Sequence, residues 1–164
     1  MKIKFKKLHK DAIIPSYQTA GASGFDFHAL STIKIAPGET KLVRTGLAVS
    51  LPEGFAPHGE FPICGDVRQI DWELQVRPRS GLSLKTPLRV ANSPGTVDRD
   101  YRGEIGIIIT NLAVPGPDVQ PITIKKGDRI AQGVICPVMR ADIEEADELP
   151  ETDRGEGGYG STGT

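Results

Sequence analysis

One stretch of this sequence reads Gly95-Thr96-Val97-Asp98-Arg99-Asp100-Tyr101-Arg102-Gly103-Glu104-Ile105, with two carboxylates, a tyrosine and two arginines between two glycines. The apolar run from Ile105 to Ile109 follows directly. The two glycines permit the tight geometry and close approach of a β-hairpin, and an aspartate at its tip is suited to act as a general base. Taken alone, Asp and Gly at such a place more often simply form a turn. The stretch therefore predicts antiparallel β structure and makes its tip a candidate reaction centre.

Short β-like runs lie on both sides of this stretch. They span residues 3–8, 32–36, 40–51, 73–77, 88–91, 104–111, 120–124 and 129–137, and Pro-Gly, Lys-Gly-Asp and Pro-Glu-Gly turns separate them. Sustained helical periodicity is absent, although residues 80–85 fit one helical turn. The pattern predicts an all-β fold of antiparallel strands, a sandwich or a barrel, with the jelly roll as one candidate.

Composition fits a single domain that needs no disulfides. The chain has 164 residues, 38 % of them hydrophobic, and a formal net charge of −1, which argues against a nucleic-acid-binding surface. Cys64 and Cys136 have neither metal-ligand nor redox spacing, so we expect buried thiols. No apolar segment approaches membrane-spanning length, and the alternating residues 1–7 do not resemble a secretory signal. We therefore expect a cytoplasmic protein.

The character of the chain changes at Ala141. Residues 142–153 are acidic, and residues 154–164 are rich in glycine. A terminus of this kind is most often merely disordered. Here an arginine, a tyrosine and two hydroxyls stand among the glycines, which also suits a flexible lid that wraps an anion and stacks on a ring. We accordingly divide the chain into a β domain, 1–140, and an arm and tail, 141–164, that closes over the active site.

Three further segments carry residues suited to the same chemistry. Residues 20–26 end in Asp26 after a glycine-rich bend, and residues 127–132 lead from a turn into a strand that holds Gln132. Residues 77–85 place Arg79, Ser80 and free backbone N–H groups at the start of the helical turn, which together make a phosphate cradle. Each segment alone has a plain structural explanation, such as a turn former or a solvated ion pair.

With the stretch 95–105 and the tail, these segments resemble, in order, the five motifs of the trimeric dUTPase family, the dUTP nucleotidohydrolases, from about residue 20 to residue 164. Five ordered motifs are far more specific than a lone glycine pattern. The resemblance implies a jelly-roll subunit in a homotrimer, with each active site built from all three chains. It also implies hydrolysis of dUTP to dUMP and pyrophosphate with Mg²⁺, which limits uracil in DNA and supplies dUMP for thymidylate synthesis.

The resemblance assigns a role to each motif residue. Phosphate contacts fall to Arg79, Ser80 and Gly81. Asp26 and Gln132 would support the phosphates and the water shell of a Mg²⁺ held mainly by those phosphates. Recognition of uracil falls to Asn92 and the backbone of Thr96, Val97 and Asp98, and Tyr101 would pack beneath the deoxyribose. The tail would supply Arg154 for the γ phosphate, Tyr159 for stacking on the base, and Gly160, Ser161 and Thr162 for further contacts.

The chemistry of these residues fits those roles. Cleavage of a triphosphate needs cations and N–H groups placed beforehand, and a metal that neutralises the leaving pyrophosphate. Asp98 would accept the proton of a water that attacks the α phosphorus in line, whereas strand alternation turns Asp100 to the other face and leaves it a structural role. Backbone groups that pair with uracil would leave cytosine mismatched, and Tyr101 would leave no room for a 2′-hydroxyl.

Residues 56–72 depart from the family pattern and are predicted to be an insertion. A metal site made of His58, Cys64 and Asp66 matches no compact ligand spacing, so we expect a surface loop or hairpin, open to a protein partner. Its removal is expected to leave an active trimer. Two smaller departures are Gly106, where relatives carry a longer side chain, and Tyr159, where phenylalanine is usual.

Two alternative functions remain open on the sequence. The first is a dCTP deaminase of the same fold, but Ile108 stands where its relatives carry a water-activating glutamate, and isoleucine cannot move protons. The second is a non-catalytic nucleotide sensor or protein-binding module. The joint presence of Asp98, Arg79, Ser80 and Arg154 argues against lost catalysis, though not against a second role.

Overall fold

The structure, a computed structural model, describes residues 1–54 and 70–158. These ranges contain strands β1 (Lys4–Lys7), β2 (Phe25–His28), β3 (Ile33–Ile35), β4 (Thr40–Arg44), β5 (Leu47–Ser50), β6 (Ile70–Arg77), β7 (Leu88–Val90), β8 (Gly95–Val97), β9 (Gly106–Asn111), β10 (Ile122–Ile124) and β11 (Arg129–Met139), with one short helix, α1 (Ser80–Lys85). The all-β prediction and the helical turn at 80–85 are confirmed. No helix in the described ranges has the length and apolar character needed to cross a membrane.

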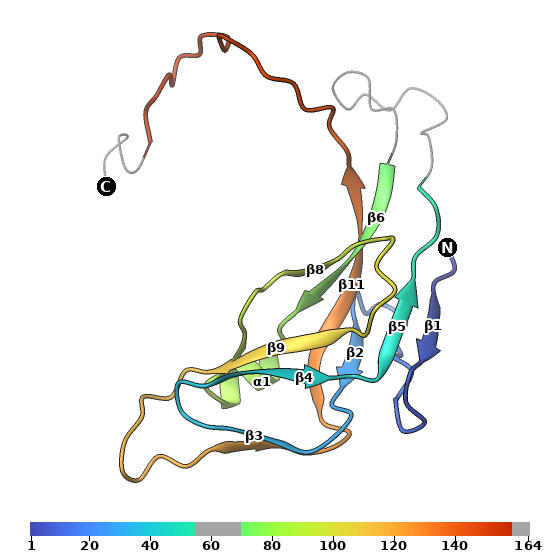
Figure 1. Ribbon diagram of the computed structural model, residues 1–164, viewed down its shortest axis with the longest axis vertical. Coiled ribbons are helices and arrows are strands. Elements are labelled where there is room, and N and C mark those ends of the chain that lie inside the picture. Colours follow the sequence, from blue (N-terminus) through green and yellow to red (C-terminus); the bar gives the residue numbers. More distant parts are fainter. Residues whose placement is uncertain (55–69, 159–164) are drawn as a thin grey trace.

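The strands form four small sheets, and neighbouring strands within each sheet are antiparallel (Figure 1). The largest sheet has the order β2-β11-β6-β8, and a three-stranded sheet has the order β4-β9-β7. The remaining strands form the pairs β1-β5 and β3-β10. The long strand β11 is the spine of the largest sheet, since it pairs with β2 along its first part and with β6 along the rest.

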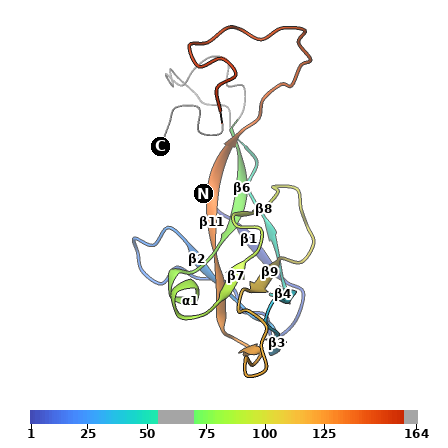
Figure 2. The same cartoon turned by 90° about the vertical axis from the view of Figure 1, so that its left-hand side faces the viewer.

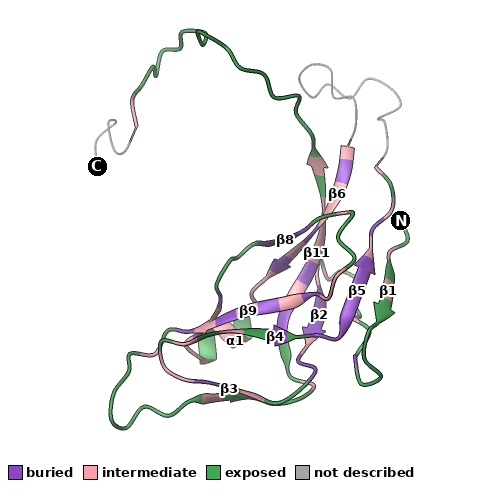
Figure 3. Ribbon diagram, in the orientation of Figure 1, coloured by how far each residue is buried: buried purple, intermediate pink, exposed green. Residues whose placement is uncertain are grey.

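One hydrophobic core joins these sheets (Figure 3). Buried residues alternate along β9 and along the second half of β6, as expected for strands with one face turned inward. The rings of Phe5, Phe25 and Phe27 meet edge to face, with centroids 5.6 to 6.3 Å apart. Phe25 and Phe27 are fully buried, and each contributes roughly 1.5–3 kcal/mol through burial. The functional residues described below are therefore carried on a rigid scaffold.

The stretch 95–105 does not form the predicted hairpin. Strand β8 pairs with β6, whereas β9 pairs with β4 and β7, so the segment between β8 and β9 crosses from one sheet to the other (Figure 1). The core explains the difference. Ile105, Ile107 and Ile109 are all at most 2 % exposed, and the Ile105 N–H donates to Leu47 O in β5.

Apart from shifts of one or two residues at strand ends, the strands differ from the prediction in three respects. Strand β6 begins at Ile70, because residues 70–72 pair with the end of β11, so it starts three residues before the predicted run 73–77 and within the predicted insertion 56–72. The predicted strand 40–51 is divided at Thr45 and Gly46 into β4 and β5. The short strands β2 and β8 were not among the predicted runs. The rest of the insertion, residues 56–69, lies outside the described residues.

The arm that follows β11 is exposed and leaves the body of the molecule (Figures 1 and 2). Its apolar residues Ile143 and Leu149 are 97 % and 84 % exposed. Nothing in the body of the same chain therefore packs around these two side chains. Cys136, predicted to be buried, is only half-buried, and its Sγ lies 3.4 Å from Arg77 Nη2, whereas Cys64 lies outside the described residues.

Candidate active site

Asp26 on β2 holds two arginines from distant parts of the chain. Arg79 Nε donates to Oδ1 at 2.7 Å and Arg129 Nη1 to Oδ2 at 3.2 Å, while Arg79 Nη1 reaches Arg129 O at 3.3 Å. The Asp26 side chain is only 10 % exposed. Burial lowers the pKa of nearby His28 despite the opposing field of Asp26, so its imidazole adds no charge at neutral pH. The cluster thus carries one surplus positive charge, as an anion site requires.

Gln132 on β11 completes this cluster. Gln132 lies opposite Asp26 in the β11–β2 pairing and opposite Arg77 in the β11–β6 pairing. The three side chains therefore share one face of the sheet. Its Nε2 donates to Pro78 O at 2.9 Å. Its Oε1 occupies the space beside Gly24, where a Cβ would lie only 2.7 Å away. This close approach explains the glycine in the bend before Asp26.

The first turn of α1 presents Ser80 and Gly81 next to Arg79. Both residues are exposed, and the first backbone N–H groups of any helix lack partners within the helix. Arg79 and Arg129 also line a cavity of about 380 Å³ between α1, β10 and the start of β11. The structure therefore places five of the predicted site residues near one another within one chain: Asp26, Arg79, Ser80, Gly81 and Gln132. The structure adds Arg129 to this cluster. Arg129 lies in the segment 127–132, but it was not among the predicted site residues.

A second cluster surrounds the turn that follows β8. Strand β8 ends at Val97, and the Tyr101 N–H donates to Asp98 O at 3.1 Å, so Asp98 and Asp100 belong to a turn. Both are exposed and both line one cavity of about 380 Å³. The argument that strand alternation separates them is therefore wrong. Alternation applies only while a residue remains in a strand.

Asp71 anchors this turn, and the sequence did not identify it. Its side chain is 9 % exposed and pairs with Arg99 Nε at 2.8 Å. Asp71 fell within the predicted insertion, and no local signal marks its partner, 28 residues away. The contact fixes Arg99, and with it the adjacent Asp98, against the beginning of β6.

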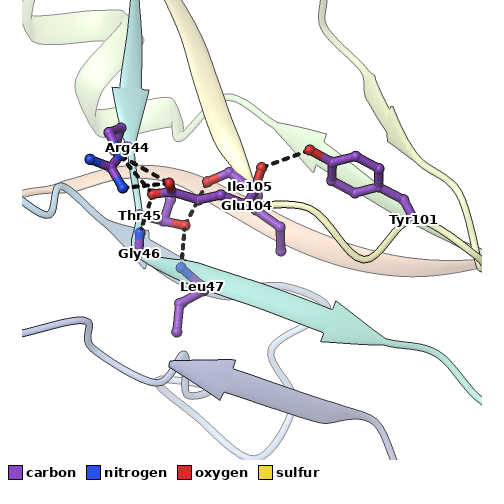
Figure 4. A network of polar contacts seen from close by, with 7 residues as sticks. All are labelled: Arg44, Thr45, Gly46, Leu47, Tyr101, Glu104 and Ile105. Atoms are coloured by element: carbon purple, nitrogen blue, oxygen red, sulfur yellow. Dashed lines mark hydrogen bonds and ion pairs between the residues drawn. The ribbon is translucent and has the colours of Figure 1, made fainter. Parts of the chain in front are cut away.

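Tyr101 lies at the far end of the same turn (Figure 4). Its Oη donates to Glu104 O at 3.0 Å, and its ring is folded across Gly103, where a Cβ would lie 2.3 Å from the phenolic oxygen. The Glu104 carboxylate accepts hydrogen bonds from Arg44 and from Gly46 N–H. Burial alone raises the pKa of Glu104, but these hydrogen bonds outweigh it and leave the pKa below its ordinary value.

The predicted uracil-reading residues lie in β8 and next to its two ends, with Asn92 in the turn before the strand and Asp98 directly after it. Asn92 and Thr96 are exposed, whereas Val97 is buried in β8 at 9 % exposure. The Asn92 amide lies against Gly95, 3.0 Å from where a Cβ would stand. These residues connect directly to Asp98.

The structure does not bring Asp98 to Arg79 within the chain. In the β6–β8 pairing Val97 lies opposite Leu74 and Gly95 opposite Val76, so Asp98 leaves at one end of the ladder and Arg79 at the other. The two cavities that these residues line share none of the described residues. One chain therefore carries two half-sites that lie apart, at opposite ends of this ladder.

The described part of the arm stays apart from both half-sites. Arg154 is exposed, and its Nε donates to Gly157 O at 2.7 Å. Tyr159, Gly160, Ser161 and Thr162 lie outside the described residues. At Gly106, whose effect the sequence left open, the Leu42 side chain fills the space beside the backbone, since a Cβ would lie 2.5 Å from Leu42 Cδ1.

The chain is similar to known proteins over almost its whole length. The dUTPase family model matches residues 60–163. The chain is 46 % identical to the deoxyuridine 5'-triphosphate nucleotidohydrolase of Nautilia profundicola over 163 residues, 99 % of each chain. It is 47 % identical to that of Helicobacter pylori strain J99, over 99 % of this chain and 97 % of the other. A mutant Staphylococcus bacteriophage 80alpha dUTPase solved with dUpNHpp superposes with a TM-score of 0.80, at 27 % identity and 99 % coverage of each chain.

Proposed function

The chain belongs to the dUTPase family and has its jelly-roll fold, and from this premise we propose that it hydrolyses dUTP to dUMP and pyrophosphate. The observation that carries the proposal is the cluster of Asp26, Arg79 and Gln132. Three sequence-distant motifs meet there on one face of a sheet, beside exposed N–H groups of α1. The enzyme would act in the cytoplasm, limit uracil in DNA and supply dUMP for thymidylate synthesis.

The arginine cluster is the triphosphate-binding half of the site. Asp26 orients Arg79 without cancelling the charge of both arginines, so a guanidinium is placed before the substrate arrives. Ser80 and Gly81 would add a hydroxyl and backbone N–H groups near the bridge between the α and β phosphates. Preplaced donors of this kind favour the charge that develops on the leaving pyrophosphate.

Mg²⁺ would contact the protein at this half-site through its water ligands and not directly. The described residues contain no group of three His, Cys, Asp or Glu side chains able to hold a metal, and arginines already engage both Asp26 oxygens. Asp26 and Gln132 would instead hold water ligands of an ion bound mainly by the phosphates, as Mg²⁺ commonly is. The ion would supply neutralisation of the pyrophosphate charge.

Asp98 is proposed as the general base. It is exposed on a turn anchored by the Asp71–Arg99 pair, so its carboxylate is accessible while its backbone is held. It would take a proton from the water that attacks the α phosphorus, a contribution of roughly 10²–10⁴ in rate. Asn92 and the backbone of residues 96–98 would read uracil, and Tyr101 would pack beneath the deoxyribose.

A homotrimer would unite the two half-sites. Asp98 and Arg79 leave opposite ends of the β6–β8 ladder, so a complete site requires the Asp98 of one chain to meet the Arg79 of another. The exposed arm would carry Arg154 and Tyr159 to a site on a neighbouring chain, with Gly160, Ser161 and Thr162 adding contacts. A lone subunit would then be inactive.

One assay tests the proposal against its alternatives. The protein is incubated with Mg²⁺ and either dUTP or dCTP, and the products are identified. Formation of dUMP and pyrophosphate from dUTP is expected. Conversion of dCTP to dUTP would favour the deaminase, which the half-buried Ile108 on β9 disfavours because it has no group to transfer protons. No turnover of either nucleotide would favour a binding module.

A further inference from the structure

Glu104 ties the turn that carries Tyr101 to the corner between β4 and β5 (Figure 4). Both of its carboxylate oxygens are engaged: Arg44 Nε lies 2.9 Å from Oε2 and 3.2 Å from Oε1, and Gly46 N–H donates to Oε1 at 2.8 Å. The Glu104 side chain is 22 % exposed, against 60 % for Arg44. The carboxylate is therefore largely shielded and held from two directions.

The backbone beside Glu104 is fastened to the same corner. Thr45 Oγ1 donates to Ile105 O at 2.6 Å, and Ile105 N–H donates to Leu47 O at 2.8 Å. Thr45, Leu47 and Ile105 are all at most 2 % exposed. Residues 104 and 105 thus have little freedom to move relative to β5.

The Tyr101 hydroxyl takes its position from this fastened backbone. It donates to the carbonyl oxygen of Glu104 at 3.0 Å, and the ring crosses Gly103 on the way. Tyr101 as a whole is 45 % exposed, so this hydrogen bond and the close approach to Gly103 are important for the position of its ring. A shift of the Glu104 carbonyl would be passed on to the ring.

We propose that Glu104 is a positioning residue that sets the discrimination between deoxyribonucleotide and ribonucleotide. The inference rests on the proposed function, in which Tyr101 packs beneath the deoxyribose. A 2′-hydroxyl adds a single oxygen atom, so the exclusion of ribose depends on the placement of the ring to within about that size. Glu104 touches no substrate and acts through the position of Tyr101.

The charge of Glu104, and not only its size, is needed for this role. The substitution Glu104→Gln keeps the shape of the side chain, but an amide has one acceptor oxygen and one NH₂ donor. That NH₂ group would face either Arg44 or Gly46 N–H, both of which are donors. The hydrogen bond to Arg44 or the one to Gly46 N–H is therefore lost, and residue 104 is held less firmly against the corner between β4 and β5.

The control is Glu39→Gln. Glu39 also accepts a backbone N–H, from Ala36 at 2.8 Å, and also pairs with a cation, Lys41, at 2.9 Å. It lies in the turn before β4, outside the contacts of Tyr101. Both variants are assayed with dUTP and with UTP, kcat and KM are determined, and stability is measured by urea unfolding.

For Glu104→Gln we expect the ratio of kcat/KM for dUTP to kcat/KM for UTP to fall by about tenfold, mainly because kcat/KM for UTP rises when the exclusion of ribose relaxes. Glu39→Gln should leave this ratio unchanged even if it loses stability. Tyr101→Phe removes the hydroxyl, so Glu104→Gln should have a much smaller effect on the ratio in that background. Arg44→Gln is a second variant in case Glu104→Gln does not fold, and it should change the ratio in the same direction.

An unchanged ratio in folded Glu104→Gln would overturn the inference, as would equal changes in Glu104→Gln and Glu39→Gln. Full additivity of Glu104→Gln and Tyr101→Phe would also overturn it, because Glu104 would then act by another route. Failure of the unmodified protein to hydrolyse dUTP would overturn the proposed function, and this inference with it.

Discussion

Arg99 Nε lies 2.8 Å from Oδ1 of Asp71 and donates to Oδ2 at 2.9 Å, so a single guanidinium nitrogen holds a nearly buried carboxylate. Asp71 Oδ1 also accepts the Trp72 N–H at 2.9 Å. The pair connects the beginning of β6 to the turn that carries Asp98. It lies on the opposite side of that turn from the Glu104 network, so the turn is held at both ends.

Asp71→Asn is expected to lower kcat for dUTP about tenfold or more, with a smaller change in KM, because the turn that carries the base loses its anchor. Breaking a paired, shielded carboxylate should also reduce stability, by about 1–3 kcal/mol. Steady-state kinetics and urea unfolding measure the two effects. A variant with normal kcat would show that Arg99 holds the turn without Asp71.

Asp98→Asn should nearly abolish turnover while nucleotide binding largely survives, since asparagine keeps the shape and loses the basicity. The matched control is Asp100→Asn, which alters an equally exposed carboxylate in the same cavity. We expect its kcat to remain within a factor of about three. Binding of a non-hydrolysable dUTP analogue is measured by calorimetry. A larger loss of kcat in Asp100→Asn than in Asp98→Asn would show that Asp100, and not Asp98, is the general base.

Truncation before Arg154 should leave the trimer folded and sharply reduce turnover. The described part of the arm has no place in the core of its own chain, so its removal costs little folding energy. Closure over the nucleotide would be lost with it. Analytical ultracentrifugation and dUTP kinetics on the truncated protein test both statements. Unchanged kinetics would show that the tail takes no part in catalysis.

Removal of residues 56–72 should do more damage than removal of residues 56–69. The longer deletion takes away Asp71, the partner of Arg99, and Trp72, which packs against the core. It also removes the strand residues that pair with the end of β11. We expect the shorter deletion to retain the trimer and most dUTP hydrolysis. Equal activity of the two proteins would show that the start of β6 is dispensable.

Glu104 should make stability depend on pH below about 4.5. Its pKa is below the ordinary value of 4.5 in the folded state, so the folded state binds fewer protons there than the unfolded state. Its contribution is present above the unfolded pKa and disappears as the pH falls through the folded pKa. Urea unfolding is measured for the unmodified protein and for Glu104→Gln at pH 7 and at decreasing pH. The difference between their free energies of unfolding should shrink as the pH falls. Parallel curves would contradict this account.

Much of the secondary structure could be predicted from local pattern. Short β-like runs between turn residues identified β9 and most of β11, and α1 lies where the run after Arg79 predicted a helical turn. Strands β2 and β8 were missed because runs of three or four residues beside glycines are too short to show alternation. The predicted phosphate-binding residues proved to be neighbours, although their roles in catalysis stay predictions.

By itself the sequence determined the strands, the turns and the kinds of chemical group present, because these depend on residues close together in the chain. Only the tertiary structure decided which strand β8 joins, since the burial of Ile105, Ile107 and Ile109 outweighs the local hairpin signal. It alone revealed the contacts of Asp71 with Arg99 and of Glu104 with Arg44, across 28 and 60 residues. It also placed Asp98 and Arg79 at opposite ends of the β6–β8 ladder, because two antiparallel strands run in opposite directions.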